Sequence, residues 1–187
     1  MKTLLTIIGT AICACTVHPA PIQYIWTATG SGALGTTAFS DTHFTFTATA
    51  DIDALEIDDV LPGIWRVLNT AVTLSVVGVG SATVDNTWTI AYGPQLPLEL
   101  HQTYFEPLAG FSIDVPGLES YDGSTDFGPA SGPAHFWHGT TNLLTSAGDF
   151  QLDSVSTGTF EAVVVPEPSF VLLGLASLIV AARGRGR

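Results

Sequence analysis

Apolar and polar residues alternate in short runs through the middle of this chain of 187 residues. In the clearest run, at 39–51, apolar Phe44, Phe46, Ala48 and Ala50 alternate with polar His43, Thr45, Thr47 and Thr49. A period of two residues predicts a β-strand with one face buried and the other in water. No stretch between 21 and 164 keeps an apolar period near 3.6 residues, so no long helix is expected there.

Similar runs bounded by Gly and Pro predict further strands at 22–29, 71–77, 82–92, 111–115, 149–155 and 158–164. In the run at 82–92, one face should hold Val84, Trp88, Ile90 and Tyr92, and the other Thr83, Asp85, Thr87 and Thr89. The glycine-rich stretch 30–35, the acidic stretch 51–59 and the Gly-, Ser- and Asp-rich stretch 116–133 are expected to be connections. The expected fold class is therefore mainly β: a single antiparallel β-sandwich, jelly-roll-like, over residues 21–164.

Residues 1–20 are predicted to be a secretory signal peptide, because a positive charge, an apolar core and turn-prone residues follow one another in that order. Cleavage after Thr16 and cleavage after Ala20 both stay open, as does lipidation of Cys15 in an imperfect lipobox. Cys13 and Cys15 are the only cysteines. No disulfide framework is expected in the domain that follows.

A second targeting element is expected at 165–187. It contains Pro166, Glu167 and Pro168, an apolar run of 13 residues at 170–182, and the arginines Arg183, Arg185 and Arg187. As a helix the run would be about 20 Å long, shorter than the roughly 30 Å hydrocarbon core of a bilayer. The two prolines oppose its extension toward the N-terminus. The pattern predicts a short C-terminal transmembrane helix whose arginines lie on the cytoplasmic side, with the β-domain outside.

This order of Pro-Glu-Pro, short apolar helix and arginine cluster resembles the PEP-CTERM sorting signal of exported bacterial proteins, over 23 of 187 residues. The resemblance implies that Pro166, Glu167 and Pro168 are the sorting motif and that an exosortase-type membrane transpeptidase processes the tail. It also implies transit through the inner membrane to the cell envelope, the surface or the extracellular matrix, and an association with exopolysaccharide and biofilm. Ectodomains rich in β-structure, such as the one expected at 21–164, are common in this family. The alternative is a permanent tail anchor.

Charge is distributed unevenly along the chain. The five basic residues are Lys2, Arg66, Arg183, Arg185 and Arg187, so Arg66 alone faces sixteen acidic residues within 21–164. Nucleic acid is excluded as a partner, because its binding depends on Lys and Arg that neutralise phosphates. The acidic surface is expected to be a solvated coat, or to attract divalent cations.

Several motifs could carry chemistry, but each has a simpler interpretation. The glycines Gly30, Gly32 and Gly35 match a dinucleotide fingerprint, yet a strand and not a helix is predicted to follow them. The acids at 51–59 and 122–126 could bind calcium, although they lack the EF-hand spacing. The pair of histidines His135 and His138 has no third ligand fixed by the sequence, so no metal site is assigned.

These observations favour a non-enzymatic protein of structural or interaction type. No cofactor is expected, with calcium left open. One alternative is a carbohydrate-binding module that stacks sugar rings on Trp26, Trp65, Trp88 or Trp137, which are otherwise expected to be core residues. Another alternative is an exported hydrolase, for which the sequence offers many carboxylates but no G-x-S-x-G element.

Overall fold

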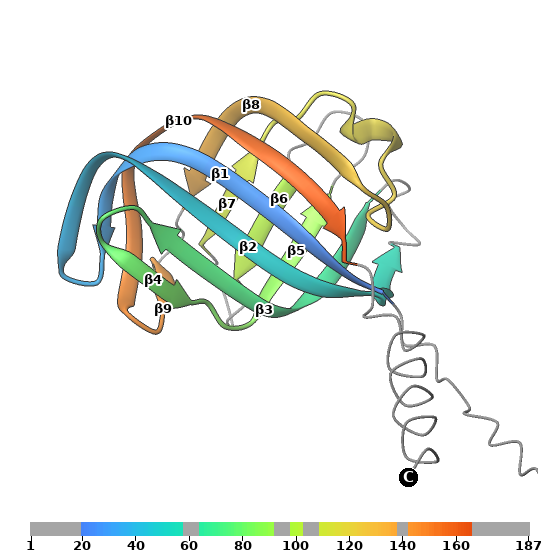
Figure 1. Ribbon diagram of the computed structural model, residues 1–187, viewed down its shortest axis with the longest axis horizontal. Coiled ribbons are helices and arrows are strands. Elements are labelled where there is room, and N and C mark those ends of the chain that lie inside the picture. The colour runs from blue at the N-terminus through green and yellow to red at the C-terminus, as the bar shows by residue number, and fades with distance from the viewer. Residues whose placement is uncertain (1–19, 58–63, 92–97, 103–108, 138–141, 166–187) are drawn as a thin grey trace, which may run out of the picture.

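The computed structural model describes residues 20–57, 64–91, 98–102, 109–137 and 142–165 (Figure 1). Within these ranges the chain forms strands and one short 3-10 helix, η1 (Leu118–Ser120). The strands are β1 (Pro21–Leu34), β2 (Thr37–Ile57), β3 (Trp65–Val76), β4 (Gly80–Thr83), β5 (Thr87–Ala91), β6 (Leu98–Gln102), β7 (Gly110–Ile113), β8 (Phe127–Trp137), β9 (Leu143–Thr145) and β10 (Gly148–Val164).

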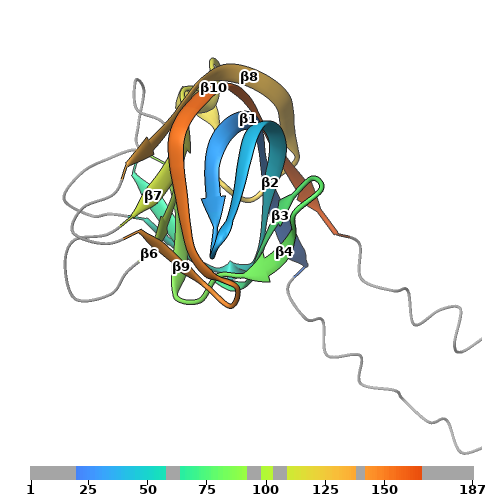
Figure 2. The ribbon, with the colours of Figure 1, turned by 90° about the vertical axis from the view of Figure 1, so that its left-hand side faces the viewer.

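Eight of these strands close into an antiparallel barrel, in the order β1-β2-β3-β5-β6-β7-β8-β10. The ring closes because β1 also pairs with β10, from Ile22 opposite Val164 to Leu34 opposite Phe150. The two short strands β4 and β9 lie outside the ring order and pair with β3 and β10. Seen nearly end-on in Figure 2, the strands surround a common axis.

The prediction of a mainly β, antiparallel fold is confirmed, whereas the expected jelly-roll-like sandwich is wrong. A sandwich keeps two sheets with free edges, and here the pairing of the first strand with the last removes them. Alternating apolar residues fit both architectures, because each buries one face of every strand. The pattern alone could not tell them apart.

Three expected connections turn out to be strand in part. Only Gly35 and Thr36 form the turn between β1 and β2, and Gly32 lies inside β1, where a Cβ atom would overlap the carbonyl oxygen of Gln151 on β10. Residues 51–57 of the acidic stretch continue β2, and residues 127–133 begin β8. Glycine therefore marks close strand contact in β1 and not a loop.

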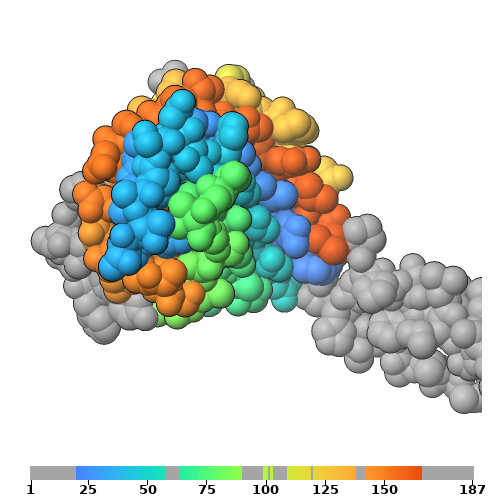
Figure 3. Space-filling model, turned by 60° about the vertical axis from the view of Figure 1, so that its left-hand side comes forward, coloured from blue at the N-terminus to red at the C-terminus, as the bar shows by residue number. Residues whose placement is uncertain are grey.

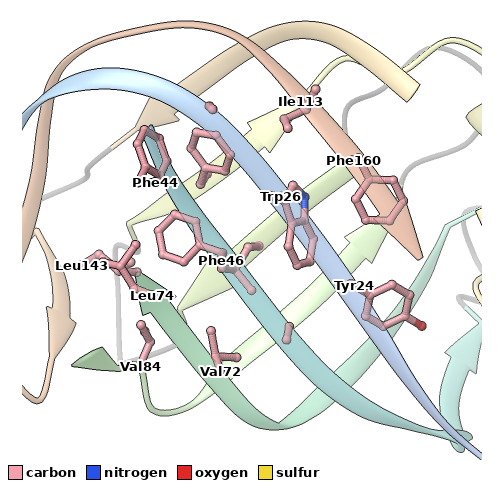
Figure 4. Packing of buried hydrophobic residues seen from close by; sticks show 14 of the residues in the cluster. Tyr24, Trp26, Phe44, Phe46, Val72, Leu74, Val84, Ile113, Leu143 and Phe160 are labelled. Atoms are coloured by element: carbon pink, nitrogen blue, oxygen red, sulfur yellow. The ribbon is translucent and has the colours of Figure 1, made fainter. Parts of the chain in front are cut away.

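Aromatic side chains from opposite walls meet inside the barrel (Figure 4). The ring centroid of Phe44 on β2 lies 5.4 Å from that of Phe111 on β7 and 5.7 Å from that of Phe150 on β10. Trp26 and Phe160 fill the neighbouring layer, with centroids 5.4 Å apart. Contacts of this kind show that the barrel is packed with side chains in these layers.

The end of the barrel that carries the hairpin turns, visible in Figure 3, is tied together by β4 and β9. The Ser146 N–H donates to the Thr83 carbonyl over 2.9 Å, and the Thr83 N–H donates to Ser146 Oγ over 3.0 Å. At the other end, the Tyr24 hydroxyl donates to the Gly123 carbonyl over 2.7 Å, and Trp65 Nε1 donates to the Tyr121 carbonyl over 3.2 Å. The loop around η1 thus packs against that end.

The two ends of the described domain lie side by side. The Val165 N–H donates to the carbonyl oxygen of Pro21 over 2.8 Å, directly beyond the last pair of β1 and β10. Outside the described residues lie residues 1–19 of the predicted signal peptide, the motif Pro166, Glu167 and Pro168, the apolar run, and Arg183, Arg185 and Arg187. Among those that are described, no helix has the length and hydropathy of a membrane span.

Candidate functional site

Strand β3 changes its partner halfway along its length. Residues Trp65 to Leu68 pair with β5, and residues Thr73 to Val76 pair with β4. Between these ladders, the Val84 N–H donates to the Val72 carbonyl over 3.0 Å. On its other side, β3 has an irregularity where Asn69 and Ala71 pair with consecutive residues of β2. The barrel wall therefore opens beside residues 69–72.

The opening forms a hollow of about 760 Å³, called the wall hollow below. It is lined by Leu68, Asn69, Thr70, Ala71, Val72 and Thr73 of β3 and by Thr83, Val84, Asp85 and Asn86. Its volume lies within the roughly 300–1,000 Å³ range of small-molecule sites. A second hollow, between His135 on β8 and Asp153 on β10, measures about 250 Å³.

The chain changes register where it leaves the wall hollow. Asn86 has a left-handed backbone with φ of 53°. Val84 is buried, and the next buried side chain is Thr87, three residues later, so the alternation shifts by one position. Thr87 and Thr89 are 1% and 0% exposed, while Trp88 is only half-buried. The expected face for Trp88 is thus wrong, because a one-residue slip moves every later side chain to the other side of the strand.

The inverted register places a polar cluster behind the wall hollow. The Thr89 hydroxyl donates to Asn69 Oδ1 over 2.9 Å, and Asn69 Nδ2 donates to the Thr87 hydroxyl over 3.4 Å. These three buried residues were not selected as candidates from the sequence. Asn69 continues the inward positions of Trp65 and Val67 on β3, so the alternation of β3 is the signal that could have found it.

Gln102 of β6 fixes the chain that leads into β5. Its Nε2 donates to the carbonyls of Asp85 and Leu144 over 3.0 and 3.1 Å, and its Oε1 accepts the Leu144 N–H over 2.8 Å. Because Gln102 is 4% exposed and uses both ends of its amide, it holds the backbone of Asp85 against β9.

Trp88 and Leu68 form an apolar lip beside the wall hollow, directly opposite each other on β5 and β3. Leu68 is 45% exposed. Arg66 lies over the Trp88 ring, with 5.5 Å between its Cζ and the ring centroid, and its Nε is 2.8 Å from Glu56 Oε2. The one basic residue of 21–164 is thus held on the tryptophan by a carboxylate, outside the lining of the wall hollow.

The other tryptophans differ in their surroundings. Trp26 and Trp65 are buried in the core, which confirms the interpretation of these two as packing residues. Trp137, half-buried on the outside of β8, lies over Gly110 of β7, where a Cβ atom would overlap its ring. Only Trp88 adjoins the wall hollow among the described tryptophans.

The candidate cation sites do not converge in the described part of the chain. His135 Nε2 lies 3.3 Å from Asp114 Oδ2, and His138 falls outside the described residues. Asp122 accepts the N–H and hydroxyl of Ser124 over 2.9 Å each, and these bonds lower the pKa of its carboxyl. Within the described ranges, no group of three or more His, Cys, Asp or Glu could hold a metal ion.

Comparisons with known proteins add no assignment. No family model, no curated protein and no solved structure matches this chain.

Proposed function

We propose that this chain is an exported bacterial surface or exopolysaccharide-matrix protein of structural or interaction type, sorted and processed through Pro166, Glu167 and Pro168. The observation that supports the proposal is the bond from the Val165 N–H to the Pro21 carbonyl, 2.8 Å long. Since Pro166 is the next residue, the motif begins where the barrel ends. Both expected processing regions therefore border the same pole of one domain.

This arrangement suits handling by membrane enzymes at both termini. A signal peptidase and an exosortase-type transpeptidase would each act at the pole where β1 begins and β10 ends, and the barrel would stand beyond that pole. The turn between β1 and β2 would then face away from the membrane, because β1 runs the full length of the barrel wall (Figure 1).

The test replaces Pro166, Glu167 and Pro168 with alanine in the full chain. We expect unprocessed precursor in the membrane fraction, detected as an intact C-terminus by mass spectrometry. The matched control is Glu161→Ala on β10, close to the motif but outside it, which should be processed as the natural chain is. Normal processing of the triple variant would contradict the proposal.

A second candidate, carbohydrate binding, is favoured by the wall hollow next to Trp88. Small-molecule sites combine apolar and aromatic side chains with a few polar groups. Here the exposed Leu68 and Ala71 lie with threonines and Asp85 in the lining, beside Trp88. The lining contains a single carboxylate, Asp85. Glycoside hydrolysis commonly requires two carboxyl groups across the scissile bond, so the lining favours binding over hydrolysis.

A further inference from the structure

We propose that the wall hollow binds a neutral hexopyranose unit of a polysaccharide, with Leu68 and Trp88 as its apolar lip and Asp85 as its main hydrogen-bond acceptor. This inference rests on the second candidate function above and supplies its site and ligand class. It is independent of how the tail is processed.

The floor and the rim of the wall hollow differ in chemistry. Val72 and Val84 belong to the barrel core and are only 3% exposed, so the apolar floor consists of the exposed Leu68 and Ala71. Thr73, Thr83 and Asp85 are exposed around it. A pyranose ring has the same division, with apolar C–H groups on its faces and hydroxyl groups at its edge. The ring can cover Leu68 and Ala71 while its hydroxyls meet the threonine hydroxyls and the carboxylate.

The charge of the lining disfavours binding of anionic ligands. The lining holds the carboxylate of Asp85 and no lysine or arginine, and Arg66 is engaged by Glu56 at 2.8 Å. A uronate or phosphate would meet a like charge without a counter-charge, which is unfavourable by Coulomb repulsion. A neutral hydroxyl instead donates to the carboxylate, and such charge-assisted bonds are stronger than neutral ones.

The lining is also a poor cage for a metal and a poor pocket for an apolar molecule. Calcium takes six to eight oxygen ligands and usually several carboxylates, whereas only one carboxylate lines this site. A purely apolar ligand would leave the polar groups of the rim without partners, which costs binding free energy. A neutral hydroxylated ring is the class that satisfies both floor and rim.

The wall hollow is held open by the fold and not by loose side chains. Gln102 fixes the backbone of Asp85 through a 3.0 Å bond, and Asn69 is engaged by Thr87 and Thr89 behind the floor. A site that is formed before its ligand arrives loses less conformational entropy on binding.

The experiment titrates the full chain with cellohexaose, maltohexaose and mannohexaose as neutral probes, and with hexagalacturonate and calcium chloride as charged ones. Tryptophan fluorescence and calorimetry report binding. We expect at least one neutral hexaose to bind with a Kd at or below about 1 mM, a common range for single weak sites. We expect the charged probes not to compete for the wall hollow.

Three variants locate the site. Ala71→Trp should fill the wall hollow and abolish binding, Asp85→Asn should weaken binding about tenfold, and Trp88→Phe should remove most of the fluorescence response. The matched controls are Ala38→Trp, on an exposed position of β2, and Asp114→Asn, both of which should bind as the natural chain does. Circular dichroism confirms that each variant is folded.

The results that would overturn the proposed glycan site differ from those that would overturn the sorting proposal. No response to any neutral hexaose, or a response only to hexagalacturonate or calcium, overturns this inference, while normal tail processing would still leave the sorting proposal intact. Binding that survives Ala71→Trp shows that the protein binds glycan elsewhere and overturns the site.

Discussion

The hydroxyl of Tyr24 donates a 2.7 Å hydrogen bond to the carbonyl oxygen of Gly123, 99 residues further along the chain. Tyr24 is fully buried, so this bond joins the first strand to the loop that follows η1 from inside the barrel. Tyr121 adds a second bond, from its hydroxyl to the Thr125 carbonyl over 2.9 Å. The loop therefore belongs to the closed interior and not to the surface alone.

Removing the Tyr24 hydroxyl should destabilise the fold. In Tyr24→Phe the ring still fills its place, but the Gly123 carbonyl loses its donor, which typically costs about 1–2 kcal/mol. Urea denaturation should show a lower midpoint with an unchanged slope. Tyr121→Phe, which removes a bond spanning four residues, serves as the comparison and should cost less. A Tyr24→Phe midpoint equal to that of the natural chain would refute the importance of this bond.

Stability should fall in alkaline solution. Burial raises the pKa of both Tyr24 and Tyr121 well above the ordinary value of 10.0. Above pH 10 the unfolded chain therefore loses phenolic protons that the folded chain keeps, and the free energy of unfolding decreases by up to about 1.4 kcal/mol per pH unit for each group. Chemical denaturation between about pH 9 and 11 measures the slope, and Tyr24→Phe should make it shallower. A free energy of unfolding that stays constant over this pH range would contradict the raised pKa of the two tyrosines.

The contact between β1 and β10 should not tolerate a side chain at Gly32. In Gly32→Ala, the new Cβ atom would overlap the Gln151 carbonyl, so the two strands must separate, at an expected cost of about 2–4 kcal/mol. The control is Gly78→Ala in the turn before β4, where a Cβ atom meets nothing within 4 Å. There only the left-handed φ of 75° is penalised, by about 1 kcal/mol. Equal losses of stability for Gly32→Ala and Gly78→Ala in thermal denaturation would argue against close packing between β1 and β10.

The polar cluster behind the wall hollow should respond cooperatively. Thr89→Val alone leaves Asn69 Oδ1 without its donor, and a stranded buried acceptor costs about 1–3 kcal/mol. Replacing Asn69, Thr87 and Thr89 together with Leu, Val and Val removes every stranded group. The loss of unfolding free energy in that triple variant should therefore be smaller than the sum of the losses in the three single variants. A thermodynamic cycle makes this comparison directly. Additive losses would show that the three side chains act independently.

The local sequence pattern predicted the strands correctly where the alternation of apolar and polar residues was unbroken. Phe44, Phe46, Ala48 and Ala50 do lie in the core, as the run at 39–51 indicates. The pattern failed where the chain changes register, since the left-handed Asn86 moves Thr87 and Thr89 inward and Trp88 outward. Such an inversion depends on the partners of β3 and β5 and leaves little trace in composition.

The candidate site was predictable only in part. Trp88 was named from the sequence as a possible stacking residue, whereas Asp85 was placed only on the polar face of its strand. The opening beside Asn69 arises because β3 exchanges β5 for β4 as its partner. Long-range pairing of this kind is set by the whole ring, so no window of neighbouring residues encodes it. The proposed sorting motif, in contrast, was predicted from a linear pattern alone, and Pro166, Glu167 and Pro168 fall outside the described residues.

The pairing of β1 with β10 also determines when folding of the barrel can be completed. Ile22 must find Val164, its partner almost a full domain length away, and contacts between such distant positions form slowly. A nascent chain that has emerged only as far as β8 still exposes two unsatisfied borders, so it cannot lock into its final shape. The ring therefore closes only once β10, the last strand of the described domain, pairs with β1.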